Sequence, residues 1–208
     1  MANIMAMLRY QPSEVREPPI AKFLFNNLQI AWVWTILRVW LGWQWFDAGR
    51  HKIDNPAWVE TGVALKGYWA RAITVPEEGR PPVTFGWYRS FLEGMLNGEH
   101  YTWFAPLIAW GEVLVGIALI VGALTGVMAF AGGFMNWNFI MAGSASSNPL
   151  LMVVAIGLML AWKTAGYWGV DRVLLPILGT PWQIGPIGKT AGGEVSRASE
   201  QGAAAAST

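Results

Sequence analysis

The sequence predicts an all-α integral membrane protein whose core is a four-helix bundle. Hydrophobic residues make up 54% of the 208 residues and charged residues only 13%, whereas an average soluble domain carries about 25% charged residues. The chain also contains 14 tryptophans and 24 glycines. Indole rings favour membrane–water interfaces, and glycine is commoner in membrane helices than in soluble ones. The length fits one compact domain.

Four apolar runs have the length of membrane-spanning helices, which need about 20 mostly apolar residues. The connections between the last three runs are short, so these helices are expected to be antiparallel neighbours, and Pro149 suits the first turn of a helix. The runs cover residues 28–47, 103–124, 127–143 and 149–168. Together they define a predicted transmembrane domain over residues 28–178.

The connection between the first two spans, residues 48–102, is long enough for structure of its own. Aromatic and apolar residues recur in it at helical spacing and predict two short amphipathic helices, one containing Trp58, Gly62, Leu65 and Trp69 and the other Trp87, Phe91 and Met95. These helices either lie in the membrane interface or fold over the mouth of the bundle with their aromatic rings inward, and the two interpretations are compatible.

The two ends of the chain differ from this domain. Residues 1–27 form a polar, proline-containing segment that does not resemble a cleavable signal. Residues 189–208 are small and polar, which predicts a disordered tail. Four spans place both termini on one side of the cell membrane, and we expect that side to be the cytoplasm because long loops are less bound by the positive-inside rule.

Small residues form a stripe along each span, and on the first three spans the stripe includes the polar residues. Because membrane helices associate through small residues and polar contacts, these stripes are expected to face the bundle interior.

Arg38 and Glu112 lie near the centres of the first two spans. A central arginine costs about 2.5–3.5 kcal/mol on insertion, so Arg38 needs a partner. We expect an Arg38–Glu112 ion pair, because both residues are close to mid-span. The pair is either a structural salt bridge that fixes helix register or part of a polar site for a ligand head group or a proton.

Two further groups are candidates for binding. Asn136 shares the inner stripe of the third span, and together with Trp137 it offers hydrogen-bond donors to a carbonyl group; the alternative is a contact that only joins helices. Asn138 points elsewhere and is expected to bond another helix or the adjoining loop. Arg50, His51 and Lys52 close the first span, either as an interfacial anchor or as a mouth that attracts anions.

Several function classes are excluded or disfavoured. The chain has no cysteine, so disulfides, thiolate metal sites and iron–sulfur clusters are excluded. Its only histidines, His51 and His100, lie outside the spans, so a haem between two histidines is not expected. We find no metal-ligand spacing and no nucleotide or flavin motif. The net charge of +1 gives no reason to expect nucleic acid as a partner.

Residue patterns in all four spans resemble the DoxX/DoxD family of membrane proteins, over about residues 28–178. The matching positions are Arg38, Gly42, Phe46, Gly49 and Lys52; Trp110, Gly111, Glu112, Gly116 and Gly122; Asn136, Trp137, Asn138, Phe139, Ala142, Gly143, Asn148 and Pro149; and Lys163, Gly166 and Asp171. The resemblance implies a four-helix membrane fold. It also implies a membrane subunit of a thiosulfate:quinone oxidoreductase, which makes tetrathionate and passes electrons to membrane quinone.

The residues then suggest how such a subunit would work. A quinone, acting as a diffusible co-substrate, would be held by Arg38, Glu112, Asn136 and Trp137, with Arg38 and Glu112 as candidates for the chemistry. The anion would be drawn by Arg50, His51 and Lys52. Coupling two thiosulfates usually needs a thiolate, a metal or a flavin, so a second protein subunit is expected. The alternative is a non-enzymatic subunit that anchors or stabilises a redox complex. A permeation or lipid-binding bundle ranks last, because the spans lack the broken helices of transporters.

Overall fold

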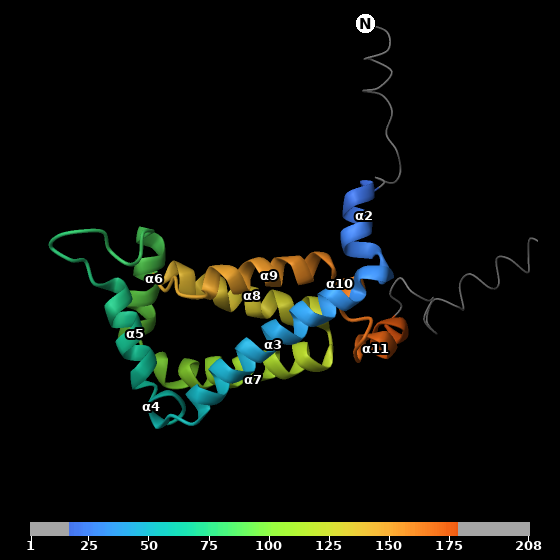
Figure 1. Ribbon diagram of the computed structural model, residues 1–208. Coiled ribbons are helices and arrows are strands. Elements are labelled where there is room, and N and C mark those ends of the chain that lie inside the picture. The colour runs from blue at the N-terminus through green and yellow to red at the C-terminus, as the bar shows by residue number, and fades with distance from the viewer. Residues whose placement is uncertain (1–16, 179–208) are drawn as a thin grey trace, which may run out of the picture.

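The computed structural model describes residues 17–178, and this part of the chain is all helical, with no strand (Figure 1). A short amphipathic helix, a single 3-10 turn and a long helix open it: α2 (Pro19–Asn26), η1 (Leu28–Ile30) and α3 (Ala31–Ile53). The connecting segment holds α4 (Pro56–Val59), α5 (Val63–Ile73) and α6 (Gly86–Asn97). The remaining helices are α7 (Tyr101–Val121), α8 (Thr125–Met141), α9 (Asn148–Leu160), α10 (Trp162–Ala165) and α11 (Asp171–Ile177).

The four longest of these helices pack side by side: α3 on α7, α7 on α8, α8 on α9, and α9 back on α3. Glycines bring α3 and α7 into backbone contact. A Cβ atom added at Gly42 would lie 2.9 Å from the carbonyl oxygen of Gly116, and one at Gly49 would lie 2.9 Å from that of Ala109. The expected inward stripe of small residues is therefore confirmed for this pair of helices.

The interior of the bundle is apolar with a few buried polar groups. Leu41, Trp45, Leu119 and Leu158 are among its core residues. Arg38, Glu112 and Asn136 are 1%, 0% and 0% exposed, so the prediction that these side chains face inward is confirmed.

The outer faces of the same helices expose large apolar side chains. These are Trp32, Ile36, Val39 and Trp43 on α3; Leu107, Trp110, Leu114, Ile117 and Val121 on α7; Val127, Phe130 and Phe134 on α8; and Leu150, Val153, Ile156 and Leu160 on α9. Among the described residues, one helix, Tyr101–Val121, is both long enough and apolar enough to cross a membrane.

The long connection lies across one end of these helices, while α2 and α11 lie at the other end (Figure 1). Inward-facing residues of α5 and α6 form a second core with the start of α7, including Leu65, Trp69, Tyr88 and Leu92. The expectation that part of this segment folds inward over the bundle is thus confirmed. Trp87 instead stays exposed.

Three predictions about the helices are corrected by these elements. The helix expected around Trp58 to Trp69 is interrupted at Gly62, which has φ +70° and packs against the backbone of Tyr101 too closely for a side chain. The predicted fourth span ends at Leu160, because Ala161 leaves helical geometry at ψ 15° and a separate turn, α10, follows. The N-terminal polar segment contains the helix α2, which was not predicted from the sequence. The predicted disordered tail lies outside the described residues.

Candidate functional site

Arg38 does not pair with Glu112, so the predicted ion pair is wrong. The guanidinium donates through Nη1 to the carbonyl oxygens of Leu119 at 2.6 Å and Ile120 at 3.3 Å, and through Nη2 to that of Trp168 at 3.1 Å. The cause is helix register. Gly42 lies beside Gly116 and Ile120, so Arg38, one turn earlier on α3, reaches the carboxyl end of the antiparallel α7.

Asp171 completes this end of the bundle. Its two carboxylate oxygens accept hydrogen bonds from the backbone N–H groups of Leu124 at 2.6 Å and Thr125 at 2.8 Å. Its own N–H donates to the carbonyl of Gly122 at 2.8 Å. A cation therefore lies at the carboxyl end of α7 and an anion at the amino end of α8, the placement that helix dipoles favour. We call Arg38 and Asp171 the capping pair. Its second member, Asp171, was not predicted from the sequence to be part of a site.

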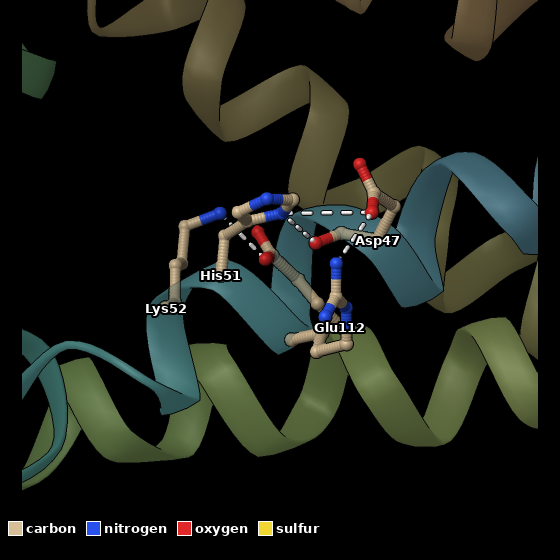
Figure 2. A network of polar contacts seen from close by, with 5 residues as sticks. Asp47, His51, Lys52 and Glu112 are labelled. Carbon is tan, nitrogen blue, oxygen red and sulfur yellow. Dashed lines mark hydrogen bonds and ion pairs between the residues drawn. The ribbon is translucent and has the colours of Figure 1, made fainter.

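Glu112 pairs with Lys52 instead. Lys52 Nζ lies 2.6 Å from Glu112 Oε2, and the two side chains point toward each other in Figure 2. The ammonium also lies over two aromatic rings, 5.3 Å from the ring centroid of Trp58 and 5.9 Å from that of Phe139. Because α3 continues to Ile53, beyond its predicted end, Lys52 turns into the protein and is not part of a surface mouth.

The other two members of the predicted anion-binding group remain outside. Arg50 and His51 are exposed, and each lies 3.6 Å from the carboxylate of Asp47. Figure 2 shows His51 beside Asp47. His51 Nδ1 also lies 2.7 Å from the carbonyl oxygen of Asp47. The structure thus separates Lys52 from Arg50 and His51 and provides the outer two with an acidic neighbour.

Several buried polar atoms around Glu112 have no hydrogen-bond partner. These are Glu112 Oε1, both amide atoms of Asn136 and the indole nitrogen of Trp45. Gly132 packs against Trp45 Nε1 and Val115. Asn136 is one turn beyond Gly132 on α8, and Glu112 is one turn before Val115 on the antiparallel α7, so both lie at the same level. We call Trp45, Lys52, Glu112 and Asn136 the buried polar cluster.

A cavity of about 240 Å³ lies next to this cluster, between α5, α6, α7 and α8. We call it the aromatic pocket. It is lined by Leu65, Tyr68, Trp69, Tyr88, Phe91, Leu92, Met95, Phe104, Ile108, Phe134, Met135, Asn138, Phe139 and Ala142. Phe139 is shared, because it lines the pocket and also lies beneath the ammonium of Lys52.

Two tyrosine hydroxyls give the pocket its polar edge. Tyr68 donates to the carbonyl oxygen of Phe139 at 3.3 Å, and Tyr88 lies 3.1 Å from the carbonyl and 3.2 Å from the side-chain oxygen of Asn138. The expectation that Asn138 bonds a neighbouring element is therefore confirmed. Burial, with a smaller contribution from nearby Tyr68, raises the pKa of Tyr88 to about 12, so this hydroxyl stays protonated at neutral pH.

Trp137 lies outside the lining of the pocket. Its ring stacks on that of Trp87 with centroids 6.5 Å apart and meets Tyr88 edge-on at 6.2 Å. Of the four residues predicted to hold a quinone, Glu112 and Asn136 therefore lie at the same level on neighbouring helices. Arg38 lies at the far end of α7, and the ring of Trp137 packs edge-on against Tyr88. The pocket itself was missed, because its lining comes from four elements distant in sequence.

Among the described residues, no group of three or more histidine, aspartate or glutamate side chains is arranged to hold a metal ion. The chain matches no family model, no curated protein and no solved structure. The geometry of residues 17–178 is therefore the main ground for assigning a function.

Proposed function

We propose that the chain is a multi-pass protein of the cell membrane and that α3, α7, α8 and α9 form a four-helix membrane bundle. Support comes from the large apolar side chains on the outer face of each helix, since monomeric soluble proteins rarely expose contiguous apolar patches of more than a few hundred Å². At about 1.5 Å per residue, the 21 residues of α7 have the length of a bilayer core of about 30 Å. The crosswise α2 and α5 suit the two interfaces (Figure 1).

We further propose that the protein is the membrane subunit of a quinone-linked oxidoreductase, and that the aromatic pocket binds the quinone. The observation that carries this proposal is an apolar, ring-lined cavity with two tyrosine hydroxyls at its edge and a buried Lys52–Glu112 pair beside it. A quinone head group is a flat ring with two carbonyl acceptors. Aromatic side chains stack on such a ring, and the Tyr88 hydroxyl, which donates to Asn138 in the structure, would exchange that hydrogen bond for one to a quinone carbonyl.

The electron donor is proposed from the resemblance to the DoxX/DoxD family. Two thiosulfate dianions would be joined to one tetrathionate dianion with release of two electrons, and the quinone would take up two electrons and two protons to become quinol. Because the chain has no cysteine, the sulfur chemistry is assigned to a second protein subunit. The membrane subunit would contribute the quinone site and its protons.

Quinone binding can be tested through the tryptophan that lines the pocket. Titrating the purified protein in detergent with a short-chain ubiquinone analogue should quench the fluorescence of buried Trp69 in a saturable way, because a quinone close to an indole is an efficient quencher. Leu92→Trp should fill the pocket and abolish saturable binding. Phe130→Trp, on the exposed outer face of α8, is the matched control and should bind normally. Wild-type protein without saturable quenching would overturn the proposal.

The activity is tested in membranes. Membranes containing the protein and its co-purifying subunit should reduce the quinone analogue when thiosulfate is added, and Leu92→Trp should remove this activity at an unchanged amount of protein. If Leu92→Trp left the rate unchanged, electrons would not pass through the aromatic pocket.

A second function, a non-enzymatic anchor of a redox complex, is favoured by the capping pair. Arg38 and Asp171 direct their hydrogen bonds to backbone groups of the bundle, which is what a stabilising role requires. In that case gentle purification should recover a stoichiometric partner, and Leu92→Trp should leave the activity of the complex intact.

A further inference from the structure

The buried polar cluster contains donors and acceptors that remain unused by the protein. Glu112 Oε1 can accept, Trp45 Nε1 can donate, and the Asn136 amide can do both, yet none of these atoms has a partner. Buried polar groups of native proteins are nearly always hydrogen-bonded, either to protein or to ordered water. These groups come from three helices, with Glu112 and Asn136 at one level and Trp45 Nε1 about one turn away, beside Gly132. Water both donates and accepts hydrogen bonds, so it is the small guest that suits them.

The cluster also has two exits. On one side Lys52 runs from Glu112 toward α4, where its side chain is 20% exposed and its ammonium lies over Trp58. On the other side Phe139 contacts Lys52 and lines the aromatic pocket, and Ile108, one turn from Glu112 along α7, lines the same pocket. The buried polar cluster therefore lies between the end of the bundle at α4 and the aromatic pocket.

We propose that the buried polar cluster is a hydrated proton path that leads from the α4 end of the bundle, past Lys52 and Glu112, to the ligand in the aromatic pocket. This inference rests on the proposed quinone site and adds the route and the residues by which its protons arrive. Asn136 and Trp45 hold the water, Glu112 carries the proton, and Lys52 is a positioning residue that holds the carboxylate through Oε2 and leaves Oε1 available.

The quinone accepts two electrons from the partner subunit, and each of its two oxygens gains one proton. Each proton leaves Glu112 through the ordered water, and the carboxylate regains a proton from water on the α4 side. No bond of the protein breaks other than the O–H bond of the glutamic acid.

Glu112→Gln separates proton delivery from ligand binding, since glutamine can still accept a hydrogen bond from Lys52. We expect unchanged quinone affinity by fluorescence quenching and at least a tenfold loss of quinone reduction. Small weak acids such as formic acid should restore part of the lost rate, which they would not do for a structural defect. Glu60→Gln, at an exposed position near α4, is the control and should retain the full rate.

A second measurement needs no quinone. Hydroxyl-radical footprinting modifies buried side chains that contact bound water, so Trp45 should be modified although it is only 3% exposed. Asn136→Leu should reduce this modification several-fold and leave that of exposed Trp43 unchanged. Unmodified Trp45, or a full rate in Glu112→Gln, would overturn the proton path. If the protein bound no quinone but Trp45 were still modified, the buried polar cluster would be hydrated but would have no quinone to supply with protons. That result would overturn the proposed function and with it the role of the proton path.

Discussion

The two ends of the bundle both bury charged groups, and they satisfy them in opposite ways. At the end near α11, the guanidinium of Arg38 donates to three backbone carbonyls and the carboxylate of Asp171 accepts from two backbone N–H groups. Within about one helical turn of Glu112, one carboxylate oxygen, an amide and an indole nitrogen have no partner. A buried charge in an apolar helix is therefore not by itself a sign of a ligand site. Arg38 Nε and Thr125 Oγ1 in the first region also have no partner, but both Nη atoms of Arg38 and both carboxylate oxygens of Asp171 are hydrogen-bonded. What distinguishes the second region is a carboxylate oxygen, Glu112 Oε1, that no donor satisfies.

The largest effect is expected from Arg38→Ala. The substitution leaves buried carbonyls of α7 without a donor and Asp171 without a nearby cation, so we expect a loss of about 3–5 kcal/mol in the free energy of unfolding. Denaturant unfolding in detergent micelles measures this loss. Arg38→Lys, which keeps the charge, should lose less. A loss below about 1 kcal/mol would remove the contrast between the two ends.

Asp171→Ala is expected to cost less, about 1–2 kcal/mol, because the amino end of α8 loses a cap that satisfies two N–H groups. Asp171→Asn keeps one acceptor oxygen and should fall between alanine and wild type. Quinone affinity should be unchanged in the folded fraction of both variants. A specific loss of binding would mean that the capping pair also serves the ligand site.

Tyr88→Phe tests the polar edge of the pocket. Losing one hydroxyl donor should weaken binding of the quinone analogue by about 0.5–1.5 kcal/mol. Because the pKa of Tyr88 is raised to about 12, its hydroxyl stays neutral and binding should not change with pH between about 6 and 9. Tyr101→Phe, whose ring packs under Lys66 outside the pocket lining, is the control. Equal affinities of Tyr88→Phe and wild type would remove this hydroxyl from the proposed site.

The smallest effect is expected from Arg50→Ala. Its side chain is exposed and its neighbour Asp47 offsets its charge, so stability should change by less than about 0.5 kcal/mol. The KM for thiosulfate should change by less than about twofold for the same reason. A large, salt-sensitive rise in KM would restore the predicted anion-attracting mouth.

The sequence was sufficient to predict the four longest helices and which of their faces turn inward, because hydrophobic period and small-residue stripes are local signals. It did not predict the short helices α2 and α11. It could not predict the pairing of Arg38, which depends on how α3 and α7 slide past each other. That register is set by the contact of Gly42 with Gly116 and Ile120. Lys52 was predicted to lie at the surface because the first span was predicted to end at residue 47, whereas α3 continues to Ile53. The aromatic pocket escaped because Tyr68, Tyr88 and Phe139 meet only after α5 and α6 fold across the bundle.

The glycine contact between α3 and α7 has a consequence for biosynthesis. These two helices touch backbone to backbone at Gly42, Gly49 and Gly116, but α4, α5 and α6 separate them along the chain. In the proposed membrane bundle, α3 would therefore wait in the bilayer until α4, α5 and α6 have been made and α7 has been inserted. Until then Arg38 lacks the α7 carbonyl oxygens that accept its hydrogen bonds, so under that proposal we expect the half-made protein to be the stage that most needs a membrane chaperone or insertase.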